Sequence, residues 1–427
     1  MSSEMDLPPT VGTLAEYSES PFERRTEWAR EGDVVRITGS EADHHMVTHP
    51  DLIQEILFTN NDAFVKFAGY TSVFGEGILT VYDDQWQAQR RTLQPAFQLD
   101  RVMSYAERMS DITEEFVARL DDGEQFDARE LFTDYSMQVM LQTLFGAEGN
   151  QADTIGEAAD RITEWFLETA TAGDVPPEVQ SDYEHGMDEL TELIEEMIET
   201  RQADAGGDGV LSMLVEAGPD SEAGYTEERI RDEMITLLFG AHETSALTLT
   251  YTLYLLADAP DVGRRLRAEL DDVLDGSLPS ADDLSELVYT EQVIDEALRL
   301  YSPAHSLFRE TVTDVTVGDH TIPEGDVVLL PQWVVHRDER WWDGPTEFRP
   351  ERFGEAETDR PGFAFFPFGA GPRRCIGESF ARAELKLVLA GLADNFEFEC
   401  LTQEFEMQAS LTAIPDRPIK VVAHARE

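Results

Sequence analysis

Most of the chain consists of segments in which hydrophobic residues recur every three or four positions. Between residues 101 and 201 such segments carry acidic residues at the intervening positions. This pattern is typical of helices that bury one face and expose the other. It predicts helices at 101–120, 128–145, 153–170 and 178–201, with further helices at 21–31, 50–59, 85–91 and 282–300. Residues 71–80, which contain two glycines, are expected to form a loop.

Short runs of alternating apolar and polar residues predict small β-sheets beside these helices. The runs lie at 33–37, 45–48, 312–317, 326–330, 395–410 and 419–422. No linker rich in Pro, Gly or Ser divides the chain, and no internal repeat is visible. We therefore expect one domain over residues 1–427, with a mainly α-helical fold and small β-sheets.

The longest predicted helix begins after Thr226, a suitable N-cap that is followed by Glu227 and Glu228. It continues to about Ala257, which corresponds to a length of roughly 48 Å. From residue 234 onward it is apolar nearly all round, as in a buried helix or a membrane span. An ionisable pair at its centre, His242 and Glu243, favours burial inside the protein.

The charge of the chain is strongly negative, at −55, and only three of its 32 basic residues are lysine. Nucleic acid is excluded as a partner, because phosphate binding requires a basic surface. A hydrophobic content of 41% argues against disorder. We interpret the acidity as an adaptation to a salt-rich cytoplasm, as in a halophile. The N-terminal residues are polar, so we expect a cytoplasmic protein without a membrane span.

One segment joins a loop rich in Gly and Pro to a helix predicted to begin near Ile376. It contains Cys375 directly after Arg373 and Arg374. A helix N-terminus and two arginines should lower the pKa of the thiol and favour the thiolate. A zinc site is not expected, since it needs about four ligands and the chain has two cysteines. A nucleophilic or a buried structural cysteine remain alternatives on the residues alone.

The pattern Phe368-Gly369-x-Gly371-x-Arg373-x-Cys375-x-Gly377 resembles the haem-binding signature of cytochrome P450, with every family position filled. The resemblance implies a P450 fold and haem b, with Cys375 as the ligand of the iron. Phe368 would pack beside the sulfur, and Gly369 and Gly377 would let the backbone approach the porphyrin. Arg373 would pair with a haem propionate.

Two further positions match P450 residues that hold propionates. Trp86 and Arg90 are four residues apart and share a helix face. Taken alone, they would be interpreted as a stack on a surface helix, but the resemblance implies that they bind one propionate. Arg309 matches the family position that reaches the second propionate.

The centre of the long helix resembles the oxygen-activating motif of the family. Thr244 would hydrogen-bond dioxygen, and Glu243 would relay protons. Ala241 stands where glycine is usual, at a position that must be small above the haem. The alternative for Thr244 is a hydroxyl that bonds the carbonyl one turn earlier.

The resemblance also implies a buried structural triad and a substrate pocket. Glu296, Arg299 and Arg352 match the triad that supports the haem loop. The expected pocket residues are Phe74, Ile78, Leu79, Ala304, His305, Ser306 and Leu307. Cys400 is expected to be an ordinary residue of a strand.

The function implied is that of a monooxygenase, which inserts one atom of O2 into an apolar organic substrate such as a lipid, fatty acid or isoprenoid. Because no flavin or nicotinamide domain follows, we expect electrons from a separate ferredoxin-type donor that docks near Arg373, Arg374 and Arg90. A haem-thiolate peroxygenase and a non-catalytic haem ligand sensor are the alternatives.

Overall fold

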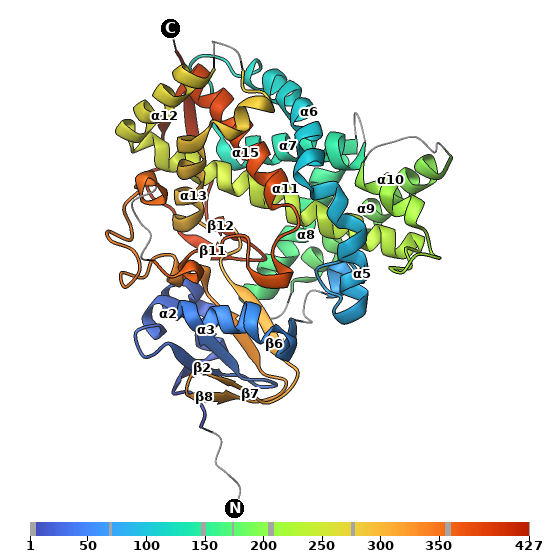
Figure 1. The fold of residues 1–427 in the computed structure, drawn as a ribbon, viewed down its shortest axis with the longest axis vertical. Coiled ribbons are helices and arrows are strands. Elements are labelled where there is room, and N and C mark those ends of the chain that lie inside the picture. Colours follow the sequence, from blue (N-terminus) through green and yellow to red (C-terminus); the bar gives the residue numbers. More distant parts are fainter. Residues whose placement is uncertain are drawn as a thin grey trace, which may run out of the picture.

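Helices form the larger part of the molecule, and most of the strands lie together at one end (Figure 1). The computed structural model describes residues 6–67, 71–146, 151–172, 175–203, 209–274, 278–354 and 360–426. The sequence predicts a break between helices at 171–177 and a loop rich in Gly and Asp at 202–209, and both ranges fall partly outside these residues.

The helices are numbered in the order in which they occur along the chain. They are α1 (Leu14–Glu19), α2 (Pro21–Trp28), α3 (Pro50–Gln54), α4 (Thr71–Phe74), α5 (Asp83–Leu93), α6 (Leu99–Val117), α7 (Ala128–Met140), α8 (Gln151–Ala172), α9 (Pro177–Ala203), α10 (Val210–Ala217), α11 (Glu227–Ala257), α12 (Pro260–Val273), α13 (Val288–Leu300), α14 (Gln332–Val335) and α15 (Glu378–Asn395). Two π-helical turns, Glu55–Thr59 and Leu141–Phe145, continue α3 and α7.

The largest sheet has the strand order β1-β2-β3-β9-β6-β4. Its strands are β1 (Thr10–Thr13), β2 (Val34–Thr38), β3 (His44–Val47), β4 (Phe64–Lys66), β6 (Leu307–Thr311) and β9 (Val327–Leu330). The smaller sheets contain β5 (Gln125–Asp127), β7 (Val315–Val317), β8 (His320–Ile322), β10 (Phe396–Cys400), β11 (Met407–Ala409), β12 (Ala413–Pro415) and β13 (Lys420–Ala425). The antiparallel pairing of β4 with β6 puts Lys66 opposite Arg309.

Helix α11 runs through the middle of the helical region and packs against α7, α13 and α15 (Figure 1). Its N-cap is Thr226, whose hydroxyl accepts a hydrogen bond from the backbone amide of Arg229. From Ile230 to Leu253 nearly every side chain is buried, because other helices cover α11 on all sides. The sequence prediction for this helix is confirmed, and its apolar surface belongs to the protein core.

The sequence prediction missed several elements. A short helix, α4, opens the expected loop at 71–80. Helices α10 and α12 were not predicted. Helix α12 has Pro260 in its first turn, where the missing amide proton of proline costs no intrahelical hydrogen bond. The predicted strand at 312–317 is shorter than expected, since only β7 at Val315–Val317 is a strand, and β6 at Leu307–Thr311 was not predicted.

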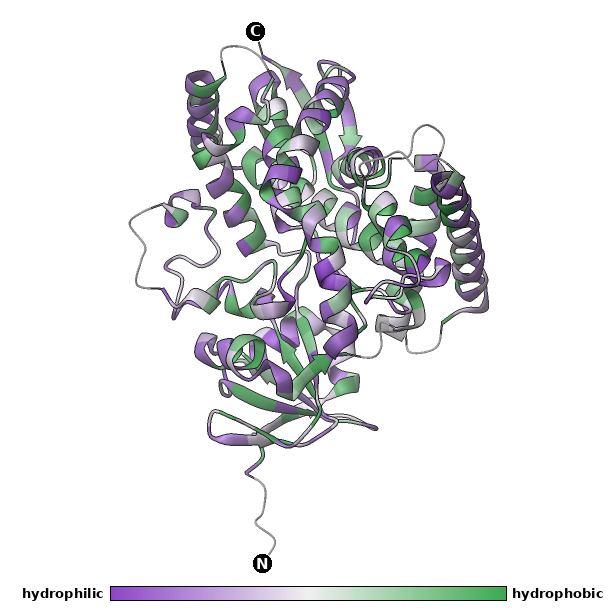
Figure 2. Ribbon diagram, turned by 45° about the vertical axis from the view of Figure 1, so that its right-hand side comes forward, coloured by the Kyte–Doolittle hydropathy of each residue, from purple (hydrophilic) through white to green (hydrophobic). Residues whose placement is uncertain are grey.

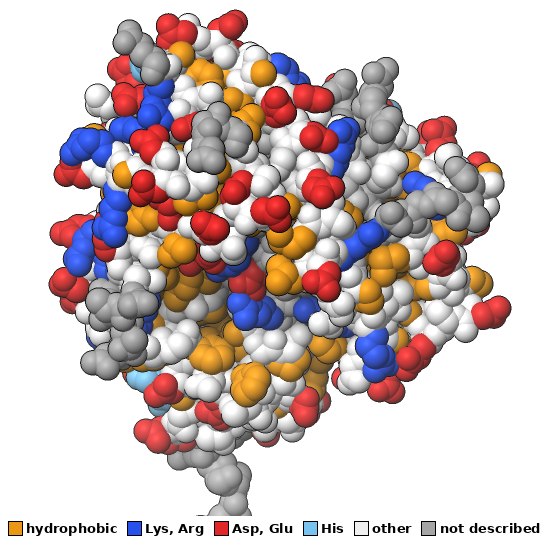
Figure 3. Space-filling view, turned by 45° about the horizontal axis from the view of Figure 1, so that its top comes forward, with side chains coloured by type: hydrophobic (Ala, Val, Ile, Leu, Met, Phe, Trp, Pro, Cys, Tyr) orange, Lys and Arg blue, Asp and Glu red, His pale blue; other side chains and the backbone are white. Residues whose placement is uncertain are grey.

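Polar residues dominate the outer helix faces, and hydrophobic residues dominate the inner ones (Figure 2). Asp and Glu side chains are spread over the molecular face in Figure 3, which also shows a hollow walled by hydrophobic side chains. Among the described residues, no helix combines the length and the apolar character needed to cross a bilayer.

Candidate functional site

A cavity of about 340 Å³ lies between α11, α5, β4, β6 and the loop that precedes α15. Its walls are mainly apolar and include Phe74, Ile78, Leu79, Phe239, Ala304 and Leu307. Five of the seven residues expected in the pocket therefore line this cavity. The described residues that line it include five cations and no carboxylate.

Cys375 lines this cavity and carries a free thiol. Its backbone amide donates to the carbonyl of Phe368 at 2.9 Å, which closes the loop around the sulfur. Helix α15 begins at Glu378 with Gly377 as its N-cap, so Cys375 lies two residues before the cap. The predicted helix is present and begins two residues later than expected, so the thiol is somewhat farther from the helix dipole than predicted.

The surroundings of Cys375 raise the pKa of the thiol instead of lowering it. Burial is the largest cause, and the carboxylate of Glu378 acts in the same direction. A hydrogen bond from the backbone of Gly377 and the charges of Arg90 and Lys66 act against this rise. In the free protein the thiol form is favoured, so formation of the thiolate depends on a bound cation such as a metal ion.

The backbone of the loop approaches its neighbours closely at Gly371. This residue has a φ of +69°, and an added Cβ would lie 1.9 Å from the carbonyl oxygen of Leu57. Only glycine fits there without a shift of the backbone. The loop is further fixed at Phe366, whose amide donates to His336 Nε2 at 3.0 Å and whose carbonyl accepts from Gln332 at 2.7 Å.

The predicted triad of Glu296, Arg299 and Arg352 forms in the interior. Glu296 Oε1 accepts hydrogen bonds from Arg299 Nη2 at 2.8 Å and Arg352 Nε at 2.9 Å. All three side chains are fully buried. The two arginines also donate to backbone carbonyls between residues 336 and 347, including that of His336. The triad therefore organises the chain that supports the loop, while it stays outside the cavity lining.

Four of the five lining cations, Lys66, Arg90, Arg309 and Arg373, converge on the cavity, while the fifth, Arg374, pairs with Glu378. Burial lowers the pKa of Lys66 well below its usual value, and Arg309 and Arg373 lower it further. Burial together with Arg309 lowers the pKa of Arg373 to about 10. A buried cluster of like charges favours an anionic ligand, since an anion would relieve both the repulsion and the desolvation.

Lys66 was not among the residues chosen from the sequence. It lies more than 300 residues before Cys375 and reaches the cavity only because β4 pairs with β6. No local motif marks it. The available signal was its rarity, as one of three lysines in the chain.

Trp86 and Arg90, the two residues of α5 that the sequence analysis selected, both line the cavity. The guanidinium of Arg373 stacks over the ring of Trp86 at 4.3 Å and donates to the carbonyl of Val81 at 2.7 Å. Arg90 donates to the carbonyl of Arg374 at 3.0 Å. These contacts join α5 to the loop that carries Cys375.

Ala241 and Thr244 contribute the α11 wall of the same cavity. The hydroxyl of Thr244 donates to the carbonyl of Gly240 at 2.8 Å, which is the bond proposed as the alternative interpretation. That bond leaves the lone pairs of the oxygen available to a ligand. Thr244 can therefore serve as both an intrahelical donor and an acceptor toward the cavity.

Glu243 lies beside this wall and is not part of the cavity lining. Its Oε2 accepts from the hydroxyl of Thr412 at 2.9 Å, and its Oε1 lies 3.5 Å from Arg129 Nη2. Thr412 does line the cavity. A proton held at Glu243 is thus connected to the cavity through the hydroxyl of Thr412.

His305 does not line the cavity, in contrast to the expectation. Its Nδ1 lies 2.7 Å from Arg25 Nη1, and its Nε2 lies 3.2 Å from the carbonyl of Ser410. Burial and the neighbouring Arg25 lower the pKa of His305 to about 3, so the ring is neutral. Ser306 is likewise absent from the lining. Cys400 lies in β10, as predicted.

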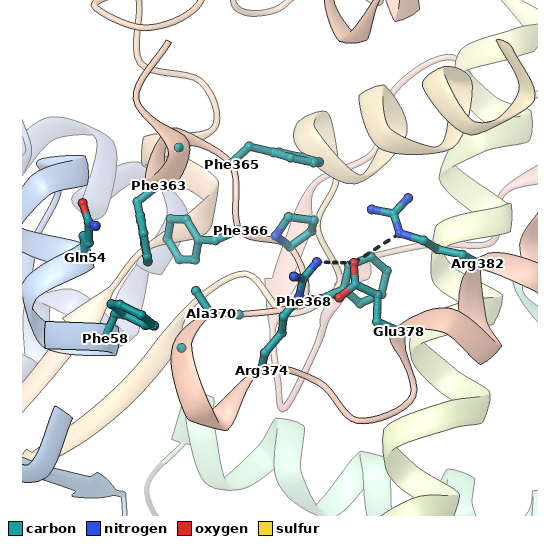
Figure 4. A pocket seen from close by; sticks show the side chains of 14 residues that line it. Gln54, Phe58, Phe363, Phe365, Phe366, Phe368, Ala370, Arg374, Glu378 and Arg382 are labelled. Carbon is teal, nitrogen blue, oxygen red and sulfur yellow. Dashed lines mark hydrogen bonds and ion pairs between the residues drawn. The ribbon is translucent and has the colours of Figure 1, made fainter. Parts of the chain in front are cut away.

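A second hollow, of about 490 Å³, lies on the outer side of the loop. In Figure 4 the rings of Phe58, Phe363, Phe366 and Phe368 surround its apolar part. Arg374 and Arg382 both point to Glu378, and dashed lines mark these ion pairs (Figure 4). Because this hollow and the cavity share Phe368 and Arg374, only the loop separates them.

Comparisons with known proteins agree on one family. The family described as "Cytochrome P450" matches residues 5–422. "Cyclooctat-9-en-7-ol 5-monooxygenase" of Streptomyces melanosporofaciens is 29% identical, covering 91% of this chain and 87% of that protein. "Pentalenene oxygenase" of Streptomyces avermitilis is also 29% identical, covering 98% and 92%.

A solved structure gives the same result for the fold. The crystal structure of the "cytochrome P450DA heme domain" has a TM-score of 0.89 to this chain at 24% sequence identity. The match covers 100% of this chain and 99% of the other. The predicted fold is confirmed.

Proposed function

The chain belongs to the cytochrome P450 family of haem-dependent monooxygenases, and from this premise we propose that it inserts one atom of O2 into an apolar, isoprenoid-like substrate. The observation that carries the proposal is one cavity that joins the Cys375 thiol, the Thr244 hydroxyl and mainly apolar walls. Lipid and fatty-acid substrates belong to the same chemical class of apolar ligands.

The residues present fit haem b. Haem carries two propionates, and the cavity offers Lys66, Arg90, Arg309 and Arg373 to neutralise them. In a chain of net charge −55, five cations around one apolar cavity favour an anionic ligand. Cys375 would bind the iron, with the backbone of Gly377 hydrogen-bonded to the sulfur.

When bound, a haem held by the Cys375 thiolate would supply oxygen activation and transfer of the oxygen atom. The protein contributes positioning, protons and the exclusion of water. Thr244 accepts or donates a hydrogen bond at the α11 wall, next to the small Ala241. Glu243 is the proposed relay group for protons, and the hydroxyl of Thr412, which donates to its Oε2, connects it to the cavity. Arg129 fixes the orientation of this carboxylate.

The apolar walls support an apolar substrate. Rings and branched aliphatic chains, including Phe74, Ile78, Phe239 and Leu307, surround the space and exclude water. The polar wall groups other than the cations are mostly hydroxyls, such as those of Thr236 and Thr248. The relatives named for cyclooctat-9-en-7-ol and pentalenene add weight to compact cyclic hydrocarbons as test substrates.

Electrons are proposed to come from a ferredoxin-type carrier that docks over the outer hollow. This surface lies directly behind the loop of Cys375, so the path to the site is short. Arg374 is 58% exposed there and can contact an acidic carrier, although Glu378 partly neutralises it. Arg373 is directed inward to Trp86 and Val81, so it contributes less to docking than the sequence suggested.

The experiment that tests the function is a turnover assay with haem-loaded protein, a cyclic isoprenoid hydrocarbon and a reconstituted ferredoxin system. We expect a hydroxylated product that requires both O2 and reductant and carries label from ¹⁸O2. Product formed from peroxide alone, without any response to reductant, would establish the peroxygenase alternative. Ligand binding without product under either condition would favour a sensor.

The docking surface has its own test, the charge reversal Arg374→Glu. Reduction of the bound haem by the carrier should slow several-fold. The matched control is Arg264→Glu on α12, which removes an exposed arginine of another surface pair. Equal reduction rates in both variants would remove Arg374 from the docking surface.

A further inference from the structure

The segment Gly75–Leu79 forms one wall of the cavity, where it contributes Ile78 and Leu79. It lies against the first turns of α11, the helix that also carries Thr244. The segment has no regular secondary structure of its own beyond turns. Its position therefore depends on backbone contacts with neighbouring helices, which are α11 and also α5, where Gln89 Nε2 donates to the carbonyl of Glu76 at 2.8 Å.

Two adjacent carboxyl groups of α11 accept hydrogen bonds from this backbone. Asp232 Oδ2 accepts from the amide of Glu76 at 2.8 Å, and Glu233 Oε1 accepts from the amide of Ile78 at 3.2 Å. Asp232 is 8% exposed and Glu233 is fully buried. The amide of the wall residue Ile78 is thus held by a group that cannot exchange its partner for water.

The approach of the segment to α11 is close enough to require glycine. A Cβ added at Gly75 would lie 2.1 Å from Asp232 Oδ2, and Gly75 has a φ of +47°. A Cβ added at Gly77 would lie 2.0 Å from Thr236 Oγ1. Thr236 also lines the cavity. Any larger residue at Gly77 would move the wall away from the helix.

Asp232 and Glu233 differ in the groups that surround their carboxyl oxygens. Asp232 is paired with Arg231 at 3.1 Å, and Glu76 is paired with Arg229 at 2.7 Å. Glu233 faces the hydroxyl of Tyr225 at 3.4 Å, and among the described residues it forms no ion pair. Burial, with the charge of Asp232, raises the pKa of Glu233 to about 8. At neutral pH it therefore acts mainly as an uncharged acceptor.

We propose that Asp232 and Glu233 are positioning residues that hold the segment Gly75–Leu79 against α11 through its backbone amides and thereby set the substrate-facing wall. This inference rests on the proposed function, since it takes the cavity as the substrate site. The backbone contacts fix the position of the wall, and the side chains of Ile78 and Leu79, which also pack against the hydrophobic core, determine which ligands fit. Substitutions at these two positions would change substrate selection and leave the wall in place.

The test is hydrogen exchange, followed by mass spectrometry, in the haem-loaded wild type and in the variants Glu233→Leu and Glu233→Gln. Glu233→Leu removes the acceptor, so exchange in residues 75–80 should become about tenfold faster. Glu233→Gln keeps a carbonyl acceptor and should exchange like the wild type. The control Glu228→Leu changes an exposed residue of the same helix.

Exchange in the core stretch 246–254 of α11 serves as the internal reference. An increase in Glu233→Leu of equal size in both stretches, or no increase in residues 75–80, would overturn the proposal. If Glu233→Leu does not fold, Gly77→Ala provides the second route, with Gly156→Ala, whose added Cβ meets nothing within 4 Å, as its control. The exchange readout needs no turnover, so a haem-loaded protein that oxidises nothing would refute the proposed function while leaving the positioning role testable.

Discussion

Individual side chains from distant parts of the sequence build the site. Cys375, Arg90 and Thr244 all line the cavity, as the motifs predicted. Glu243 and His305, in contrast, do not line it: Glu243 is connected to it through Thr412, and His305 bonds Arg25. A motif fixes the order of residues along a segment, whereas the side that a given residue faces depends on the neighbouring elements. For that reason residue identity was predictable and orientation was only partly so.

Lys66 provides a prediction at this scale. If it neutralises a haem propionate, Lys66→Gln should weaken haem retention by about tenfold, since one charge-assisted bond to a carboxylate is lost. The measurement is the rate of haem transfer to an excess of a haem-binding acceptor protein. Lys420→Gln is the control, because Lys420 lies in β13 and pairs with Asp127 at 3.7 Å. Equal transfer rates in both variants would contradict this role.

At the scale of elements, the long helices were predictable and the short ones were not. Helix α11 is predicted by its N-cap residue Thr226 and by a continuous apolar stretch. Helix α10 has only eight residues, and α4 only four, so a periodic pattern has too few turns to show. The triad of Glu296, Arg299 and Arg352 was found because its motifs kept the family order, although no spacing alone predicts that three segments meet.

Helices α11 and α15 are also joined by a buried hydrogen bond, from Ser245 Oγ to Glu384 Oε2 at 2.8 Å. Burial raises the pKa of Glu384 from 4.5 to about 7. The folded protein therefore binds this proton more tightly than the unfolded chain does. The stability contributed by the proton is complete below pH 4.5 and is lost as the pH rises to about 7.

A comparison of the wild type with Glu384→Gln tests this linkage. Relative to the variant, the wild type should lose about 3 kcal/mol of unfolding free energy between pH 4.5 and 7, and no more above pH 7. Denaturant unfolding at several pH values measures the difference. A constant difference across this range would show that Glu384 has the same pKa in the folded and unfolded states.

At the scale of the whole molecule, most of the negative charge lies on the exterior. The net charge of −55 belongs mostly to the surface, where Asp and Glu side chains are scattered over the face seen in Figure 3. The halophilic interpretation and the single domain over residues 1–427 remain predictions. Sequence alone predicts the charge and the fold, but the concentration of five cations around one cavity becomes visible only when the strands and helices are assembled.

Salt dependence is the prediction for this scale. Raising KCl from about 0.1 to 1 M shortens the Debye length from roughly 10 to 3 Å and screens the surface repulsion. The midpoint of thermal unfolding should rise by at least about 5 °C. CsCl at equal ionic strength should give a similar rise, because screening depends on ionic strength. An unchanged midpoint would contradict the halophilic interpretation.

The central claim is that Cys375 binds the haem iron as a thiolate in this cavity. The measurement that tests it most directly is the absorption spectrum of the reduced, carbon monoxide-bound protein, recorded for the wild type and for Cys375→His. The account predicts a strongly red-shifted Soret band for the wild type and a band like that of a histidine-ligated haem for the variant. A wild-type spectrum without the red shift, or the same red-shifted band in both proteins, would contradict it.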